Sequence, residues 1–141
     1  MDKSETYIKM CEKAEEIQAQ REAVIGNFYY DPLTGVRIVG TTDPEGVNPF
    51  TIFNKQLEDS RFIWLPRQDQ LQEMIRDITK PRRLIWVFYD WLKSLVVEDK
   101  VCPSGNYFSN SNLNYESLEQ LWLSFLMKEC WNKTWNGKDW I

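Results

Sequence analysis

The pattern that most constrains the fold of this chain lies near residues 27–39. An aromatic run at residues 27–30 and a run rich in β-branched side chains at residues 36–39 flank the turn sequence Asp31-Pro32-Leu33-Thr34-Gly35. Proline presets the φ of a turn and glycine supplies a positive φ, so the segment predicts a β-hairpin with a short loop. The fold is therefore expected to contain an antiparallel sheet.

Four further segments show the spacing of apolar residues that is typical of amphipathic helices. The expected helices cover residues 3–24, residues 66–79, a segment that begins at Pro81, and residues 117–131. The third of these helices is apolar nearly all round, which is typical of a helix that is buried or part of an interface.

The remaining segments are shorter or less regular. Residues 61–65 predict a strand, residues 50–53 fit either a short helix or a strand, and residues 99–114 predict a polar surface loop. No repeat and no clean linker divides the chain. The prediction is a single α+β domain over residues 1–141, with about four helices packed on a small antiparallel sheet.

The composition removes most kinds of catalytic site. The chain has no histidine, which is the commonest general base and the commonest metal ligand. It also has no glycine-rich phosphate loop, no nucleophile elbow and no paired cysteine motif. Several carboxylates lie between residues 31 and 59, but their spacing fits turns and solvated charge better than a metal loop. We therefore expect a binding protein and not an enzyme, with no catalytic residue, metal or cofactor.

The cysteines and the apolar runs bear on the cellular compartment. The three cysteines fit no zinc or redox spacing, and Cys11 and Cys130 fall on apolar helical faces, so both are expected to be reduced core residues. No targeting segment is visible at the N-terminus. The most apolar run, residues 84–97, contains Asp90 and Lys93 and is too short to span a bilayer. The prediction is a cytoplasmic protein with no membrane partner.

The aromatic content points to a docking surface. Aromatic residues make up 14% of the chain and include seven Trp, which exceeds what a small core requires. The formal net charge of −4 argues mildly against a protein whose main task is to hold a phosphate backbone. A protein partner is the expectation, and nucleic acid is the alternative.

Three groups of residues are candidates for partner binding, and each also has an ordinary structural interpretation. A strand-to-helix junction carries outward-facing polar groups, a basic cluster offers charge to phosphates or an acidic surface, and a Trp-rich tail offers aromatic anchors. The alternatives are helix capping, a solvated helix end, and a tail folded back over the core. The groups are Trp64, Arg67, Gln68 and Asp69; Arg76, Lys80, Arg82 and Arg83; and Trp131, Trp135 and Trp140.

Two stretches resemble a known kind of protein. Residues 63–74 (IWLPRQDQLQEM) resemble a segment of small uncharacterised proteins of bacteriophages and prophages of Gram-positive bacteria. Residues 118–129 together with residues 133–140 (KTWNGKDW) resemble the closing segment of the same proteins. The resemblance covers about 80 residues of the C-terminal part and carries over no catalytic residue.

The resemblance implies a cellular context. Small acidic phage proteins without an active site often act stoichiometrically, as inhibitors or adaptors of host or defence machinery. It therefore implies a phage-encoded accessory protein in the cytoplasm of a bacterial host cell, whose partner is a host or defence-system protein, as for an anti-CRISPR-like inhibitor. The alternative is a nucleic-acid-associated factor of phage replication or recombination, for which the basic cluster and the Trp-rich tail speak. The oligomeric state is left open.

Overall fold

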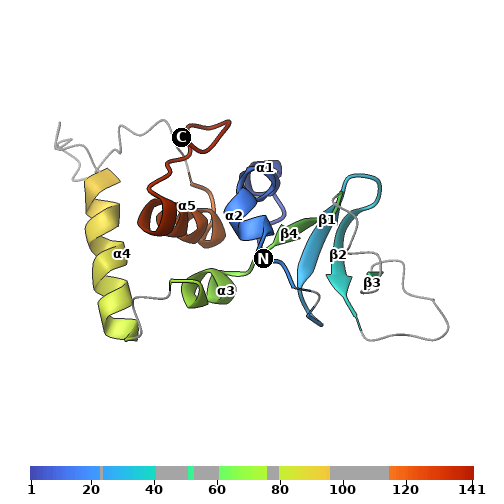
Figure 1. Ribbon diagram of the computed structural model, residues 1–141, viewed down its shortest axis with the longest axis horizontal. Coiled ribbons are helices and arrows are strands. Elements are labelled where there is room, and N and C mark those ends of the chain that lie inside the picture. Colours follow the sequence, from blue (N-terminus) through green and yellow to red (C-terminus); the bar gives the residue numbers. More distant parts are fainter. Residues whose placement is uncertain (23, 41–50, 53–60, 76–79, 96–114) are drawn as a thin grey trace, which may run out of the picture.

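The computed structural model describes residues 1–22, 24–40, 51–52, 61–75, 80–95 and 115–141, and these form five helices and four strands (Figure 1). The fold is α+β, as predicted. In chain order the elements are α1 (Glu5–Lys13), α2 (Glu15–Gln18), β1 (Phe28–Asp31), β2 (Gly35–Val39), β3 (Thr51–Ile52), β4 (Ile63–Leu65), α3 (Gln68–Glu73), α4 (Pro81–Leu95) and α5 (Leu118–Trp131).

The sheet has the strand order β3-β2-β1-β4. β1 pairs antiparallel with both β2 and β4, which confirms the antiparallel sheet, and β3 adds a parallel pair to β2. The predicted hairpin is confirmed as β1 and β2. Its turn is held by Asp31, whose carboxylate accepts hydrogen bonds from the Leu33 N–H and the Thr34 hydroxyl, and by Gly35 at a φ of +84°.

The structure answers part of the question whether the segment of residues 41–60 contains a helix or a strand. Residues 51–52 are a strand and not a helix, whereas residues 41–50 and 53–60 lie outside the described residues. The predicted surface loop at residues 99–114 also lies outside them. The short strand predicted at residues 61–65 is confirmed as β4.

The prediction of one helix over residues 3–24 is wrong. Ser4 caps α1, because its hydroxyl accepts a hydrogen bond from the Tyr7 N–H at 3.2 Å. The backbone then breaks at Ala14 (φ −88°, ψ 74°), and the second piece, α2, ends at Gln18. The break has a tertiary cause, since it lets the Gln18 amide reach both the Cys11 carbonyl and β4.

The later helices follow the predictions more closely. α3 is shorter than the predicted helix over residues 66–79, and residues 76–79 lie outside the described part of the chain. α4 begins at Pro81 as expected from the preference of proline for the first helical turn. α5 begins after Ser117, whose hydroxyl accepts from the Gln120 N–H at 3.1 Å, and it ends at Trp131, as predicted.

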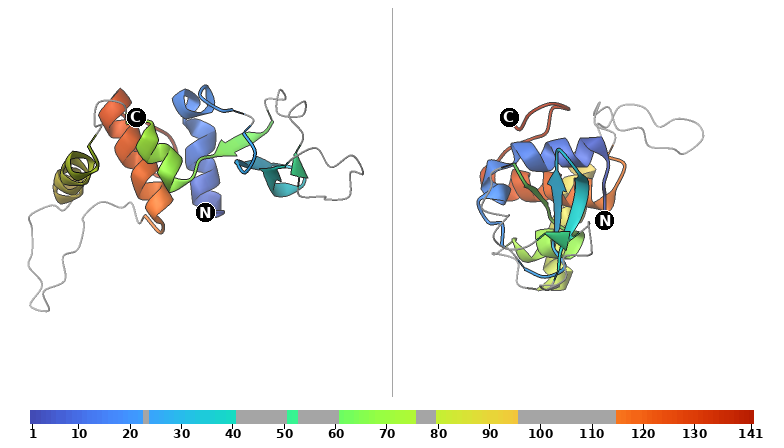
Figure 2. Two further views of the ribbon diagram at one scale, coloured as in Figure 1. Left: turned by 90° about the horizontal axis from the view of Figure 1, so that it is seen from below. Right: turned by 90° about the vertical axis from the view of Figure 1, so that its right-hand side faces the viewer.

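The elements follow one another along the long axis of the molecule, with α4 at one end and the hairpin at the other (Figures 1 and 2). α5 lies beside α4, α3 and α1 come next, and the sheet follows. The core is formed where α1, α3, α5 and β4 meet, and its fully buried side chains include Tyr7, Met10, Leu65, Leu71 and Phe125.

The two described cysteines differ from one another. Cys11 is buried in the core, as predicted, whereas the prediction that Cys130 is a core residue is wrong, because Cys130 is exposed. The buried run of α5 ends at Met127, and the three residues that follow it, Lys128 to Cys130, are exposed. None of the helices among the described residues is both long and apolar enough to cross a membrane.

Candidate functional site

The structure describes all seven indoles, and one of them, Trp86, is exposed. Trp64, Trp122 and Trp135 are each 3% exposed. Trp91, Trp131 and Trp140 are half-buried and pack against the core. The indoles are therefore mostly interior, and the exposed one lies on α4.

The Trp-rich tail folds back over the core. Trp135 and Trp140 face each other across an isolated β-bridge with ring centroids 5.1 Å apart. The Trp140 indole N–H donates to the Met10 carbonyl at 2.9 Å, which ties the tail to α1. This arrangement is the alternative of a tail that covers the core. It does not present Trp135 to a partner, and it leaves Trp131 and Trp140 partly accessible.

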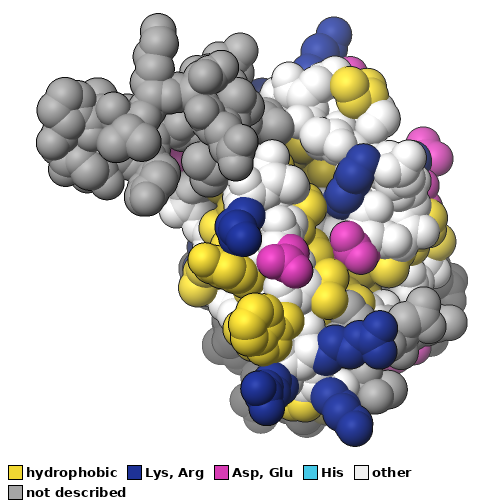
Figure 3. Space-filling view, turned by 90° about the vertical axis from the view of Figure 1, so that its left-hand side faces the viewer, with side chains coloured by type: hydrophobic (Ala, Val, Ile, Leu, Met, Phe, Trp, Pro, Cys, Tyr) yellow, Lys and Arg dark blue, Asp and Glu magenta, His cyan; other side chains and the backbone are white. Residues whose placement is uncertain are grey.

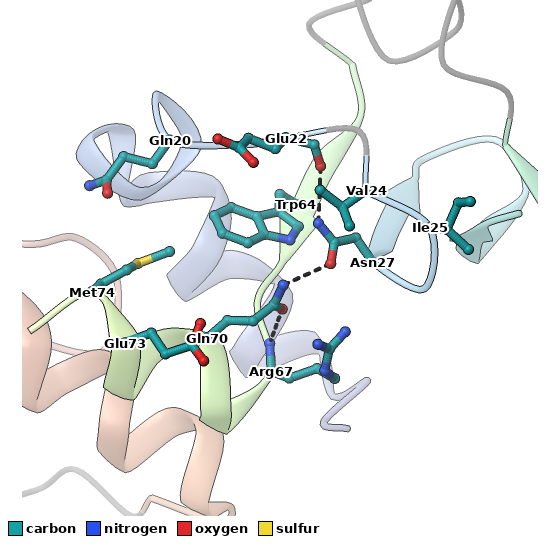
Figure 4. Close-up of a pocket in the computed structure, with 10 residues that line it drawn as sticks. All are labelled: Gln20, Glu22, Val24, Ile25, Asn27, Trp64, Arg67, Gln70, Glu73 and Met74. Atoms are coloured by element: carbon teal, nitrogen blue, oxygen red, sulfur yellow. Dashed lines mark hydrogen bonds between the residues drawn. The ribbon is translucent and has the colours of Figure 1, made fainter. Parts of the chain in front are cut away.

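The strand-to-helix junction is occupied by internal contacts. Trp64 is buried, and the guanidinium of Arg67 donates to both carboxylate oxygens of Asp69 and to the Gly26 carbonyl. The hydrogen bond from Arg67 lowers the pKa of Asp69. Gln68 is half-buried at the first position of α3. Beside this junction lies a hollow of about 380 Å³, which Figure 4 shows from close by.

The basic cluster is exposed where the structure describes it. Lys80, Arg82 and Arg83 are exposed at the start of α4, whereas Arg76 lies outside the described residues. Residues 80–95 hold four Lys or Arg against one acidic residue, Asp90, although the whole chain is acidic. The described segment of residues 80–95 is therefore net positive.

Sequence reasoning missed three exposed apolar residues on α4. Ile85, Trp86 and Tyr89 are 57%, 58% and 54% exposed. With Arg82 and Lys93 they follow the three- and four-residue spacing that places side chains on one side of a helix. We call these five residues the α4 face. The Lys93 ammonium lies 5.5 Å from the centroid of the Tyr89 ring, and Figure 3 shows apolar side chains over α4 with basic ones gathered at its lower end.

The opposite side of α4 explains why this face is left in solvent. The Phe88 ring stacks on Trp122 of α5 with centroids 4.0 Å apart and planes 7° apart. The ring centroids of Trp91 and of Phe125 on α5 are 5.4 Å apart, and Leu84 also packs against the core. These contacts set the rotation of α4 on α5. The residues of the α4 face are therefore not needed to hold the helix in place.

The described residues offer little that would support a chemical step. No group of three or more His, Cys, Asp or Glu among them gathers closely enough to hold a metal ion. Burial raises the pKa of the Cys11 thiol and of the Tyr7 hydroxyl, so both stay protonated near neutral pH. This part of the chain presents to other molecules an exposed surface, the α4 face, and a hollow beside Trp64.

Comparison of the chain with protein-family models, with curated proteins and with solved structures gave no match.

Proposed function

We propose that this protein acts by stoichiometric binding to a protein partner, which it contacts through the α4 face. The observation that carries the proposal is the exposure of Trp86 together with Ile85 and Tyr89, on a helix whose opposite side is already packed. Adjacent large apolar side chains of this kind in solvent mark interaction sites. Trp, Tyr and Arg are also the residue types that dominate binding energy at protein interfaces.

The size of the patch indicates what it can do. From the exposed fractions of the three side chains, the accessible apolar area is roughly 300 Å². At about 25 cal/mol per Å² its burial contributes about 7 kcal/mol before the entropic cost of association. That is enough for the centre of an interface but not for a whole one, because a typical interface covers about 800 Å² on each partner. We infer that surrounding polar residues complete the contact.

The charges around the patch favour a protein over a nucleic acid. The cations lie at the ends of the α4 face, with Arg82 at one end and Lys93 at the other, and the middle is apolar. A phosphate backbone requires a row of cations, and the net charge of −4 repels it. An apolar surface bordered by carboxylates complements this face, and such complementarity steers association and sets register. The proposed partner surface has that chemistry.

The resemblance to phage proteins supplies the proposed setting. A phage-encoded accessory protein would meet its partner in the cytoplasm of the bacterial host. The specific form of our proposal is that the partner is a host or defence-system protein and that the contact inhibits it, as an anti-CRISPR-like inhibitor does. Support for this form comes from the resemblance of residues 63–74 and of the C-terminal segment, together with the exposed apolar side chains of the α4 face.

The test compares two single substitutions in a quantitative affinity capture from host cells. Trp86→Asp places a charge at the centre of the α4 face, and Leu33→Asp places one at the hairpin turn, where Leu33 is 78% exposed at the opposite end of the molecule. We expect the wild type and Leu33→Asp to retain the same protein at a stoichiometric level and Trp86→Asp to lose it more than tenfold. A photo-crosslinking residue at position 89 should join that same protein.

Two outcomes would contradict the proposal. One is capture of the same proteins by all three forms, which would place binding elsewhere. The other is capture of nucleic acid alone, removed by nuclease and falling steeply with salt, which would favour the replication or recombination factor. The anti-defence form is tested separately, by phage plating on a CRISPR-immune host. Expression of the wild type should raise plating, and expression of Trp86→Asp should not.

A further inference from the structure

The hollow beside Trp64 has the features of a binding site and lies outside the α4 face. Its walls come from the segment between α2 and β1, from β4, and from α3 with the residues at its two ends (Figure 4). Its volume of about 380 Å³ lies at the lower end of the range for ligand pockets, which suits a group the size of one amino-acid residue.

A hydrogen-bond donor without a partner lies just beneath the surface of the hollow, where Trp64 lines it. The Trp64 indole N–H has no partner, although the residue is only 3% exposed. A buried indole N–H nearly always has a partner, and leaving one without it costs about 1–3 kcal/mol. An acceptor from outside the chain would complete this site.

The neighbouring side chains are locked and do not supply that acceptor. The Gln70 side-chain oxygen accepts from the Arg67 N–H at 2.9 Å, and its amide nitrogen donates to the Asn27 side-chain oxygen at 2.7 Å. The Asn27 amide nitrogen in turn donates to the Glu22 carbonyl at 3.0 Å. Each amide nitrogen keeps a second N–H, so the floor presents donors held in place before any ligand arrives.

The rim of the hollow is acidic. Glu22 and Glu73 are both exposed and lie on either side of the Trp64 indole in Figure 4. Arg67 does not offset them, because its guanidinium is paired with Asp69 at 3.1 Å. Val24 and Met74 add apolar surface. The floor therefore selects a neutral acceptor such as a carbonyl, and the rim selects a cation joined to it by an apolar stem.

We propose that this hollow binds a lysine or arginine residue within a peptide. The main-chain carbonyl of that residue accepts a hydrogen bond from the Trp64 indole N–H. Its methylene stem lies against Val24 and Met74, and its cationic end lies between Glu22 and Glu73. The hollow is separate from the α4 face. The proposed ligand of the hollow is cationic, whereas the proposed partner of the α4 face carries carboxylates.

Nuclear magnetic resonance on ¹⁵N-labelled wild-type protein tests this proposal directly. The indole N–H signal of Trp64, assigned by triple-resonance experiments, is followed during titration with Nα-acetyl-arginine methylamide and Nα-acetyl-lysine methylamide. Both should shift it saturably at millimolar concentration or below. Nα-acetyl-norleucine methylamide, which keeps the carbonyl and lacks the charge, should bind more weakly. Free arginine should also bind more weakly, because the rim repels its carboxylate.

Paired variants separate the rim from the general charge of the protein. Glu73→Gln should weaken binding of the arginine probe by about twofold to fivefold, which is the range for one solvated ion pair. Glu12→Gln on α1 changes the net charge equally and should leave the affinity unchanged.

Three results would overturn the proposal. A Trp64 signal that no probe moves would mean that the indole N–H serves a buried water only. Equal binding of the norleucine probe would show that the side-chain cation does not contribute to binding. Tighter binding of free arginine than of the blocked residue would replace a peptide by a free amino acid.

Discussion

Gln18 pairs the middle of the outer edge of the sheet, between Arg21, which donates to the Phe62 carbonyl, and Tyr7, whose hydroxyl donates to the Pro66 carbonyl. β4 is an edge strand, and its outward groups at alternate residues are the Phe62 carbonyl, both backbone groups of Trp64 and the Pro66 carbonyl. Gln18 accepts from the Trp64 N–H at 2.8 Å and donates to the Trp64 carbonyl at 3.0 Å, as a neighbouring strand would. Unpaired edges invite pairing with other chains, so this side-chain ladder closes a vulnerable edge.

The substitution Gln18→Met measures this contribution. Methionine keeps the length and most of the volume of the side chain and removes its three hydrogen bonds, which are to the Trp64 N–H, the Trp64 carbonyl and the Cys11 carbonyl. At about 1 kcal/mol for each bond, the expected loss in the free energy of unfolding is about 3 kcal/mol. For a chain of 141 residues this lowers Tm by about 6–12 °C.

The assay is reversible urea unfolding followed by circular dichroism, with Gln20→Met as the matched control. Gln20 lies two residues further along, and its amide makes one local hydrogen bond, to the Glu16 carbonyl at 3.2 Å. The control should lose no more than about 1 kcal/mol. If both variants lose the same stability, or if Gln18→Met loses less than the control, the strand-like role of Gln18 is refuted.

The variant Gln18→Glu adds a pH test of the same contacts. An ionised carboxylate can still accept from the Trp64 N–H, but it cannot donate to the two carbonyls, so folding favours the protonated form and raises the pKa of the new group. A raised folded pKa gives stability that is present below the unfolded value and is lost as pH rises through the folded value. Gln18→Glu should therefore approach the wild type in mild acid and lose stability towards neutral pH.

Three further predictions concern other parts of the chain. Burial of Asp2 raises its pKa, but hydrogen bonds led by that from Ser117 outweigh burial and lower it. The carboxylate accepts three hydrogen bonds, so Asp2→Ala should cost up to about 3 kcal/mol near neutral pH. In acid-titrated unfolding the difference from the wild type should shrink as pH falls below the ordinary value of 3.8. Phe88→Ala should raise the hydrogen-exchange rates of α4 amides several-fold while those of the sheet are unchanged, because Phe88 stacks α4 on α5. Maleimide labelling mapped by mass spectrometry should modify Cys130 in the native protein and Cys11 only after unfolding, since burial also raises the thiol pKa of Cys11.

Local signals in the sequence were sufficient for several elements. The Asp31-to-Gly35 turn specifies its hairpin through contacts within a few residues, and Ser117 caps α5 in the same local way. The break at Ala14 carries no comparable signal. It depends on Gln18 reaching Trp64, 46 residues away, and no short window of sequence contains both.

The candidate site was harder to predict for a related reason. Apolar residues surround α4, so the pattern indicates an interface without saying which side is packed. The stack of Phe88 on Trp122 decides that question, and it places Trp86 outward. In the tail, the pairing of Trp135 with Trp140 buries Trp135, which the sequence had offered as one of three aromatic anchors.

The way α4 is attached has a consequence for partner binding. None of its residues is fully buried, and a helix of its 15 residues is marginal in water by itself. Its stability therefore comes from the aromatic contacts with α5 and is lower than that of the core helices. A partner that binds the α4 face binds only the docked, folded helix, so it stabilises that helix by mass action. Hydrogen exchange of α4 amides should slow when the partner is added, whereas a ligand in the hollow beside Trp64 should slow exchange at the β4–α3 junction instead, so one measurement assigns each ligand to its surface.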